Sequence, residues 1–185
     1  QAGAGQDIRT QPALSLDGNT IYFGSRDDKL HAVNTADGTG KWTFDTGNNV
    51  ESSPIVDKNG IIYFGSNSNN IYAIRDNGQN SRTELWREPS SFSRDFRASP
   101  ALSRDANQTR LYIGDTAGRI YAFDTTDPDT TKSRRIWRSQ AGTSALVTQF
   151  VVGPNDNIYL TSSNDRLYAI QDNGASATDL TSGGF

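Results

Sequence analysis

Short apolar runs recur along the chain, and polar, turn-forming residues separate them. Residues 21–33 read IYFGSRDDKLHAV and residues 62–74 read IYFGSNSNNIYAI, with looser copies at 111–123 and 158–170. The tyrosine in second position of these copies recurs after 41, 49 and 47 residues. A fixed period of about 20 to 50 residues is typical of repeat architectures, so the repeat determines the fold prediction.

Each copy predicts four short strands joined by turns rich in Asn, Asp and Gly. The first strand is predicted at 11–15, 53–57, 99–103 and 148–152. The second and third strands are the two apolar runs of each copy. The fourth strand is centred on a tryptophan in three of the copies: Trp42, Trp86 and Trp137.

The predicted strands are apolar on both faces. In the second strand of the first copy, Ile21 and Phe23 lie on one face and Tyr22 on the other. A sheet with one face in water would alternate between apolar and polar residues, so these sheets are expected to be covered on both sides. Small residues at Gly24, Gly65, Gly114 and four alanines are expected to leave room for Tyr and Trp rings of adjacent sheets.

The sequence therefore predicts an all-β fold in which four-stranded antiparallel sheets form the blades of a β-propeller. The four predicted blades span residues 10–47, 51–90, 97–140 and 146–182 of a single propeller segment.

The recurring SPALS, IYFGS and IYAI elements, followed by tryptophan, resemble the pyrroloquinoline-quinone-like (PQQ-like) propeller repeat from residue 10 to about 180. The resemblance implies a ring of seven or eight blades, of which this chain holds four. Leu180 stands where the fourth tryptophan is expected, and the first nine residues contain no tryptophan to complete that blade. Two alternatives follow: the chain is part of a longer propeller, or two copies form an eight-bladed ring. Either alternative leaves the outer faces of the first and fourth blades without a neighbour in this chain, so a homodimer or higher assembly is expected.

Composition narrows the functional classes. The chain has a net charge of −3, so it is not expected to bind nucleic acid, which requires Lys and Arg to neutralise phosphates. It has no cysteine, which excludes a disulfide scaffold, and no apolar run long enough to span a membrane. It also has no methionine, which indicates a processed product or a segment of something longer.

We interpret the candidate catalytic residues as structural residues. His31, the only histidine, occupies the position of Tyr72, Tyr121 and Tyr168 in the other copies, so we interpret it as an aromatic substitute and not as a general base. The aspartates that could form a carboxylate pair occupy equivalent turns, where Asp is an expected turn former: Asp17, Asp57, Asp105 and Asp156, then Asp27, Asp28, Asp115 and Asp165.

Three further aspartates, Asp124, Asp127 and Asp129, could supply oxygen ligands to calcium, although a solvated loop is the preferred interpretation. Quinone-dependent enzymes of the resembling family use a calcium site, a tryptophan floor and a disulfide of adjacent cysteines. None of these can be matched here, so we expect no cofactor, no catalytic residue and no enzyme activity.

The longest connection, residues 87–100, carries Phe92, Arg94, Phe96 and Arg97. Exposed aromatic and arginine side chains are typical binding anchors, and Arg26 and Glu51 are predicted on the same rim. The alternative is that Phe92 and Phe96 only attach the loop to the blade below.

We therefore expect a non-catalytic scaffold that presents propeller loops to a protein partner or an extended ligand. The resembling family includes the propeller lipoprotein of the outer-membrane protein assembly machinery, which implies a bacterial periplasmic or cell-surface location. Two alternatives remain: a fragment of a larger quinone-dependent or sugar-processing enzyme, and a structural or designed repeat assembly.

Overall fold

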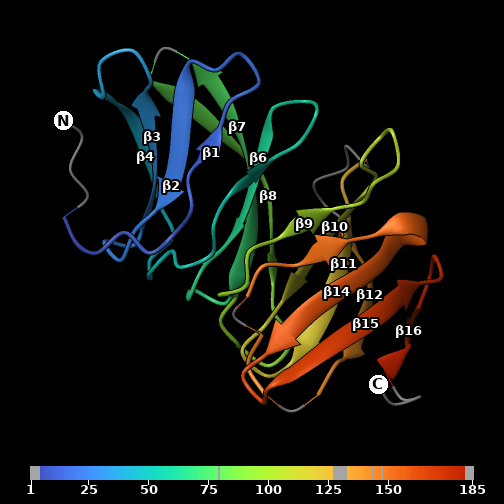
Figure 1. The fold of residues 1–185 in the computed structure, drawn as a ribbon. Coiled ribbons are helices and arrows are strands. Elements are labelled where there is room, and N and C mark those ends of the chain that lie inside the picture. Colours follow the sequence, from blue (N-terminus) through green and yellow to red (C-terminus); the bar gives the residue numbers. More distant parts are fainter. Residues whose placement is uncertain (1–4, 79, 127–132, 143, 147, 182–185) are drawn as a thin grey trace. The chain divides into compact units, whose positions relative to one another are not determined.

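The computed structural model describes residues 5–78, 80–126, 133–142, 144–146 and 148–181. In these ranges the chain forms four antiparallel sheets of four strands, and within every sheet neighbouring strands are consecutive in the chain. The prediction of an all-β fold made of four-stranded propeller blades is confirmed (Figure 1). The one short helix in the described residues is the 3-10 turn Pro154–Asp156, and nothing in them resembles a membrane-spanning helix.

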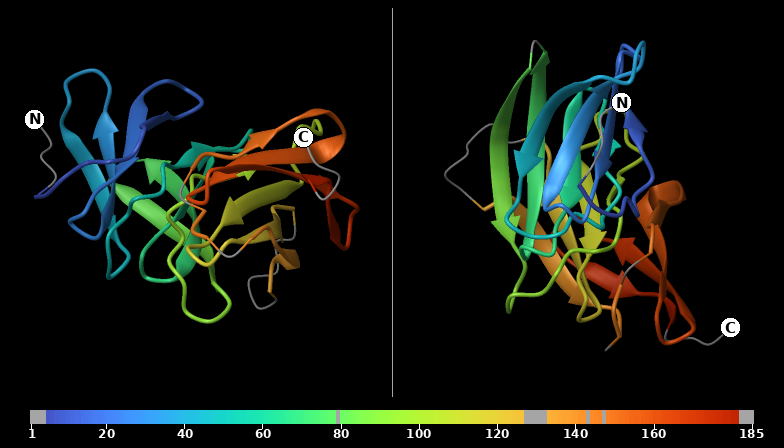
Figure 2. Two further views of the ribbon diagram at one scale, coloured as in Figure 1. Left: turned by 60° about the horizontal axis from the view of Figure 1, so that its bottom comes forward. Right: turned by 90° about the vertical axis from the view of Figure 1, so that its left-hand side faces the viewer.

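The chain divides into two compact units, Gln1–Phe96 and Arg97–Phe185. Each unit contains two of the sheets, which we number as blades 1 to 4 in chain order. The four sheets extend over residues 13–45, 55–89, 101–140 and 151–179. The strands of each unit can be followed by colour in the two further views of Figure 2.

The strands of the first unit are short at the start of each blade and longer toward its end. Blade 1 consists of β1 (Ala13–Leu14), β2 (Thr20–Gly24), β3 (Lys29–Asn34) and β4 (Gly40–Asp45). Blade 2 consists of β5 (Ile55–Val56), β6 (Ile61–Gly65), β7 (Asn70–Gly78) and β8 (Ser81–Pro89).

The second unit repeats this arrangement. Blade 3 consists of β9 (Ala101–Leu102), β10 (Arg110–Gly114), β11 (Arg119–Asp124) and β12 (Arg135–Gln140). Blade 4 consists of β13 (Val151–Val152), β14 (Asn157–Ser162), β15 (Arg166–Asp172) and β16 (Ala177–Asp179).

The core of the first unit lies between its two sheets. Tyr22, Leu30 and Trp42 from blade 1 pack with Phe64 and Tyr72 from blade 2. Blade 2 therefore presents a buried, fully apolar face to blade 1, as the absence of polar alternation predicted. Burying one large apolar side chain contributes about 1.5 to 3 kcal/mol, so this layer is a major source of stability for the unit.

In blades 1, 2 and 3 the recurring alanine lies between two aromatic rings of its own blade, whereas Ala169 in blade 4 lies between Tyr159 and Leu180. Ala32 is opposite Tyr22 on one side and Trp42 on the other, and the two ring centroids are 5.8 Å apart. The corresponding Tyr–Trp distances are 5.8 Å in blade 2 and 6.0 Å in blade 3. The Tyr and Trp rings beside these three alanines therefore belong to the same sheet, and Ala32 also lies in the core layer that contains Phe64 and Tyr72 of the adjacent blade.

The glycines that end the second strands also have different neighbours from those predicted. A Cβ atom on Gly24 would lie 2.4 Å from Cγ1 of Val50, and one on Gly114 would lie 2.7 Å from Cβ of Leu146. Val50 and Leu146 belong to the connections between blades. These glycines therefore allow a connecting segment, and not a Tyr or Trp ring, to approach the strand.

The turn between the second and third strands has the same backbone geometry in every blade. The residue directly before the third strand has a positive φ: 70° at Asp28, 67° at Asn69, 81° at Gly118 and 61° at Asp165. Asp, Asn and Gly adopt this left-handed conformation at the lowest cost, which explains why these residue types recur at the position.

Candidate interaction surface

The predicted binding loop is attached at both ends to one turn of blade 2. Ser90 N donates to the carbonyl oxygen of Asn69 at 2.7 Å, and Phe96 N donates to that of Ser66 at 3.2 Å. Both acceptors belong to the β6–β7 turn, so residues 90–96 form a short arch over it. We call this arch the Phe92 loop.

Phe92 lies near the tip of the Phe92 loop with 72% of its surface exposed. Its φ is 65° and that of Ser93 is 50°, so two successive non-glycine residues adopt the left-handed conformation. For a bulky residue this conformation costs on the order of 1 to 3 kcal/mol, and it persists only where the surroundings impose it. Arg94 N donates to Oγ of Ser90 at 2.6 Å, which closes the loop internally.

Phe96 is fully buried, at 0% exposure. The prediction that Phe96 contacts a partner directly is therefore wrong, and the alternative that it attaches the loop to the blade holds for this residue. Phe92 remains a candidate contact residue, because its ring is exposed. Arg94 and Arg97 are also exposed, although Arg97 already belongs to the second unit.

Arg26 and Glu51 are brought together on the first unit, as predicted for a shared rim. Arg26 donates to Oε1 of Glu51 from Nε at 2.7 Å and from Nη2 at 2.5 Å. Nδ2 of Asn67 donates to the other carboxylate oxygen at 3.2 Å. Since Asn67 follows Ser66, this ionic cluster lies beside the base of the Phe92 loop.

Asn67 is a residue that sequence reasoning missed. Its side chain is 7% exposed, and its Oδ1 has no hydrogen-bond partner among the described residues. A buried amide oxygen without a donor is costly, so it is an acceptor available to an N–H or O–H group. No sequence signal marked it, because its position in the turn is occupied by Arg26, Thr116 and Ser163 in the other repeats.

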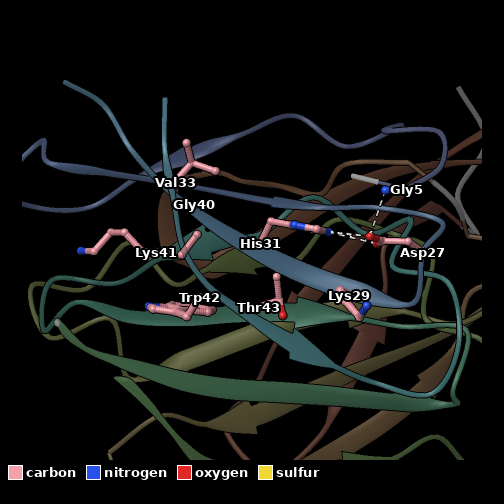
Figure 3. Close-up of a pocket in the computed structure, with 10 residues that line it drawn as sticks. Gly5, Asp27, Lys29, His31, Val33, Gly40, Lys41, Trp42 and Thr43 are labelled. Atoms are coloured by element: carbon pink, nitrogen blue, oxygen red, sulfur yellow. Dashed lines mark hydrogen bonds and ion pairs between the residues drawn. The ribbon is translucent and has the colours of Figure 1, made fainter. Parts of the chain in front are cut away.

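His31 lines a pocket of about 580 Å³ on blade 1, together with Lys29, Lys41 and Thr43 (Figure 3). Nε2 of His31 lies 3.0 Å from both carboxylate oxygens of Asp27, and the imidazole stacks on Phe23 with centroids 5.0 Å apart. Figure 3 shows the ring directed at Asp27 along the sheet.

The His31–Asp27 pair replaces a neutral pair found in blades 2 and 4, whereas in blade 3 Tyr121 donates to the carboxylate of Asp115 at 2.7 Å. Tyr72 shares a hydrogen bond of 2.9 Å with Ser68, and Nδ2 of Asn164 donates to Tyr168 at 2.9 Å, each across the same four-residue spacing. The geometry therefore matches the structural interpretation of His31. Burial opposes ionisation of Asp27, but the hydrogen bonds from His31 and Gly5 outweigh it and lower the pKa of this carboxyl.

The aspartates of the first turns act as turn formers. Asp17, Asp57 and Asp105 each accept a hydrogen bond from the backbone N–H two residues later, at 3.0, 2.9 and 2.9 Å. Asp156 differs, because it accepts one from Arg104 N at 3.2 Å and so links blade 4 to blade 3.

Metal ligation has no support in the described part of the chain. It contains no group of three His, Cys, Asp or Glu side chains that could hold a metal ion. Of the proposed calcium ligands, Asp124 accepts hydrogen bonds from the backbone N–H and the hydroxyl of Thr126 at 2.7 and 2.6 Å. Asp127 and Asp129 lie outside the described residues.

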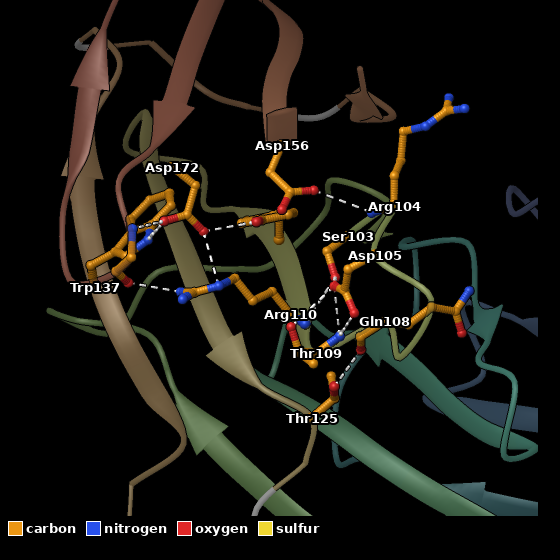
Figure 4. A network of polar contacts seen from close by, with 12 residues as sticks. Ser103, Arg104, Asp105, Gln108, Thr109, Arg110, Thr125, Trp137, Asp156 and Asp172 are labelled. Atoms are coloured by element: carbon orange, nitrogen blue, oxygen red, sulfur yellow. Dashed lines mark hydrogen bonds and ion pairs between the residues drawn. The ribbon is translucent and has the colours of Figure 1, made fainter. Parts of the chain in front are cut away.

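A second set of residues missed by sequence reasoning joins neighbouring blades. Asp172, at the end of β15, accepts hydrogen bonds from Tyr112 Oη at 2.8 Å and Trp137 Nε1 at 2.9 Å, both in blade 3 (Figure 4). Nε of Arg110 lies 3.3 Å from the same carboxylate. We call this arrangement the aspartate network.

The first unit repeats the aspartate network around Asp76. Tyr22 donates to it at 2.9 Å and Trp42 at 3.0 Å, while Nζ of Lys41 lies 3.6 Å away. In both blades the aspartate begins an Asp-Asn-Gly sequence, and its Oδ1 accepts from the glycine N–H at 2.8 Å. That tripeptide, at 76–78 and 172–174, was the available sequence signal.

Comparison with known proteins identifies the family to which the chain is similar. Residues 12–178 match the family model described as outer membrane protein assembly factor BamB. Protein Rv3035 of Mycobacterium tuberculosis (strain ATCC 25618 / H37Rv) is 35% identical over 81 residues, which are 43% of this chain and 20% of that protein.

Solved structures show the same fold at low sequence identity. The chain matches BamB from Moraxella catarrhalis with a TM-score of 0.67 and 19% identity, over 91% of this chain and 48% of that one. It matches U3-55K and the RRP9 WD40 repeats with TM-scores of 0.75 and 10% identity, over 96% of this chain and 53% and 52% of theirs. The chain thus spans about half of each of these structures. Because the family match extends over most of its length, the chain belongs to the BamB-like PQQ β-propeller repeat family.

Proposed function

We propose that this chain is a non-catalytic scaffold that binds a protein partner through the Phe92 loop. The observation that carries the proposal is the 72% exposure of Phe92 on a loop whose two ends are hydrogen-bonded to one turn. An exposed aromatic ring on a pinned loop is a binding anchor that loses little conformational entropy on association.

The surroundings of Phe92 supply the polar part of such a surface. Arg94 is exposed two residues away, and the Arg26–Glu51 pair with Asn67 lies beside the loop base. An aromatic centre with arginine and other polar groups around it is the composition of protein–protein interfaces. We therefore retain Phe92, Arg94, Arg26 and Glu51 as contact residues and assign Phe96 to loop support.

The family supports a bacterial, extracytoplasmic location for this binding. Its description names an outer-membrane protein assembly factor, which works in the cell envelope by that description. We carry over only the class of partner, a protein, and the compartment.

The proposal is tested with the purified chain immobilised and exposed to a bacterial envelope extract, with recovered proteins quantified by mass spectrometry. A partner bound through the loop should be recovered about tenfold less by the Phe92→Ala and Arg94→Ala variants. Leu16→Ala is the matched control, because Leu16 is 64% exposed in the first turn of blade 1, away from the loop. Equal recovery by the wild-type chain and the Phe92→Ala variant would refute binding through the loop.

A further inference from the structure

Three asparagines of the chain are directly followed by glycine, at Asn59–Gly60, Asn77–Gly78 and Asn173–Gly174. In this dipeptide the glycine nitrogen can attack the side-chain carbonyl carbon of the asparagine, because glycine has no side chain to hinder the approach. A new C–N bond then closes a five-membered succinimide ring, and the side-chain nitrogen leaves as ammonia. Water opens the ring at either carbonyl group, which leaves aspartate or isoaspartate in place of asparagine.

The three dipeptides are alike in exposure and in backbone conformation. All three asparagines are exposed. The following glycines have φ values of 76°, 69° and 93°, so each lies in the left-handed region. Differences in reactivity between the three sites must therefore come from their hydrogen bonds.

The attacking nitrogen is bonded to a carboxylate in both hairpins of the aspartate network. Gly78 N donates to Oδ1 of Asp76 at 2.8 Å. Gly174 N donates to Oδ1 of Asp172 at the same distance. This nitrogen must give up its proton to close the ring, and an anionic acceptor holds the proton and opposes a second negative charge beside it. Ring closure is therefore disfavoured at Asn77 and Asn173.

The attacking nitrogen of the third site has a neutral acceptor. Gly60 N, in the β5–β6 turn, donates to the backbone carbonyl oxygen of Asp57 at 3.0 Å. The carboxylate of Asp57 is engaged elsewhere, because its Oδ1 accepts from Asn59 N at 2.9 Å and from Ile61 N at 2.8 Å. A hydrogen bond between neutral groups is about half as strong as a charge-assisted one, so the proton of Gly60 N is held least firmly.

The side chain under attack is also held in the two hairpins. Nδ2 of Asn77 donates to Oγ1 of Thr83 at 2.8 Å, across the β7–β8 hairpin. Nδ2 of Asn173 donates to Oγ1 of Thr178 at 2.7 Å, across the β15–β16 hairpin. The side chain loses this bond when it turns toward the glycine nitrogen. Within the described ranges the Asn59 side chain makes no hydrogen bond, so it turns without such a loss.

We propose that Asn59 is a site of spontaneous deamidation in the folded chain, and that the hairpins protect Asn77 and Asn173 by holding both reacting groups. The aspartate network then has a chemical role besides joining two sheets. Two hydrogen bonds must break at each hairpin before the ring closes, so we expect conversion there to be at least about tenfold slower than at Asn59.

Conversion of Asn59 changes the charge and the backbone of one turn of blade 2. Aspartate adds a negative charge beside Asp57, and isoaspartate lengthens the backbone by one carbon between the two N–H groups that Asp57 accepts. Since Tyr63 Oη also donates to Asp57, at 3.2 Å, the altered turn is connected to the buried strand β6. The β5–β6 turn lies at the opposite end of β6 from the Phe92 loop, so this proposal does not depend on partner binding.

Peptide mass spectrometry of the purified chain after incubation in mildly alkaline buffer tests the proposal. Conversion is recognised by the mass difference between an amide and an acid, and chromatography separates isoaspartate from aspartate. Asn59 should convert first in the folded chain. A chain unfolded in guanidinium chloride is the control, because it lacks these hydrogen bonds and should convert all three asparagines at similar rates.

Valine variants of the two hairpin threonines test the cause of the protection. Thr83→Val and Thr178→Val remove the hydroxyls at exposed strand positions where valine suits the strand. Each variant should speed conversion of its own asparagine and leave Asn59 unchanged. Thr43→Val is the matched control, since Thr43 is an exposed threonine of the outer strand β4, and it should change none of the three rates.

Three results would overturn the proposal. The first is conversion of Asn77 or Asn173 in the folded chain as fast as that of Asn59. The second is the same order of rates in the unfolded chain, since the local sequence and not the fold would then set them. The third is an unchanged rate at both hairpins in the valine variants.

Discussion

Tyr112 of blade 3 donates a 2.8 Å hydrogen bond to Asp172 of blade 4, a residue 60 positions later in the chain. Burial and the hydrogen bond to Asp172 raise the pKa of Tyr112 above its ordinary value, so the phenol stays protonated and remains a donor. Tyr22 and Asp76 form the same contact at 2.9 Å in the first unit. A tyrosine–aspartate hydrogen bond therefore joins the two sheets within each unit.

Removing the carboxylate should destabilise the second unit strongly. We expect Asp172→Ala to lower the free energy of unfolding by about 2 to 4 kcal/mol, because Tyr112, Trp137 and Gly174 N–H each lose an acceptor. Urea denaturation followed by tryptophan fluorescence measures this. Asp7→Ala is the control, since Asp7 is 69% exposed in its side chain, and it should change stability by less than about 0.5 kcal/mol. Equal effects of the two variants would contradict the role of the aspartate network.

The two phenylalanines of the binding loop should respond in opposite ways to truncation. Phe96→Ala should cost about 3 to 5 kcal/mol of stability, because it leaves a cavity at a fully buried position. Phe92→Ala should change stability by less than about 0.5 kcal/mol, or raise it slightly if the left-handed backbone relaxes. Thermal melting of both variants distinguishes them. A large loss of stability in Phe92→Ala would mean that its ring supports the fold.

Gly114 should not tolerate even a methyl group. A Cβ atom there would lie 2.7 Å from Leu146 and 2.9 Å from Phe150, so we expect Gly114→Ala to cost about 1 to 3 kcal/mol through overpacking. Thr161 occupies the same position in blade 4 and is exposed, so Thr161→Ala is the matched control and should be nearly neutral. A Gly114→Ala chain as stable as the wild type in urea would show that Leu146 moves freely.

The carboxyl of Asp17 should titrate far below its ordinary range. The hydroxyl of Ser15 donates to it at 2.6 Å and Asn19 N at 3.0 Å, which lowers its pKa to about 2. Carbon-detected NMR titration should show this midpoint, and Ser15→Ala should move it upward toward the ordinary pKa of 3.8. An unchanged midpoint in Ser15→Ala would exclude the hydroxyl as the main cause.

Acid should weaken the fold through Asp27. The folded-state pKa of this carboxyl lies below its unfolded value, so its stabilising effect is complete above about pH 4 and is lost as pH falls through the folded pKa. We expect His31→Phe to reduce the part of the acid dependence that comes from Asp27, because the variant removes the histidine hydrogen bond. Urea denaturation at a series of pH values measures this. Identical acid profiles of variant and wild type would assign the acid sensitivity to other carboxylates.

The strands and turns were predictable because their causes are local. A short apolar run bounded by turn-forming residues identifies a strand, and Asp, Asn or Gly at a left-handed position identifies a turn, within a few residues of sequence. Both signals recur four times, so each copy supports the others. Asp28, Asn69, Gly118 and Asp165 show this, because they differ in side chain and share one backbone conformation.

The candidate site was only partly predictable. The length and composition of the loop identified the segment that carries Phe92, but nothing in the sequence distinguishes Phe92 from Phe96. Both rings have the same burial preference, and the two hydrogen bonds to the β6–β7 turn decide which one enters the core. The role of Asn67 could not be predicted for a similar reason, since it depends on the Glu51 carboxylate, which only the fold brings near.

The sequence by itself determined the repeat, the four strands of each blade and the family, because short apolar runs and turn chemistry are properties of short segments. Only the tertiary structure decided which ring is buried and which carboxylate joins two blades. These outcomes depend on residues such as Tyr112 and Asp172, whose attraction acts only after separate sheets have packed together.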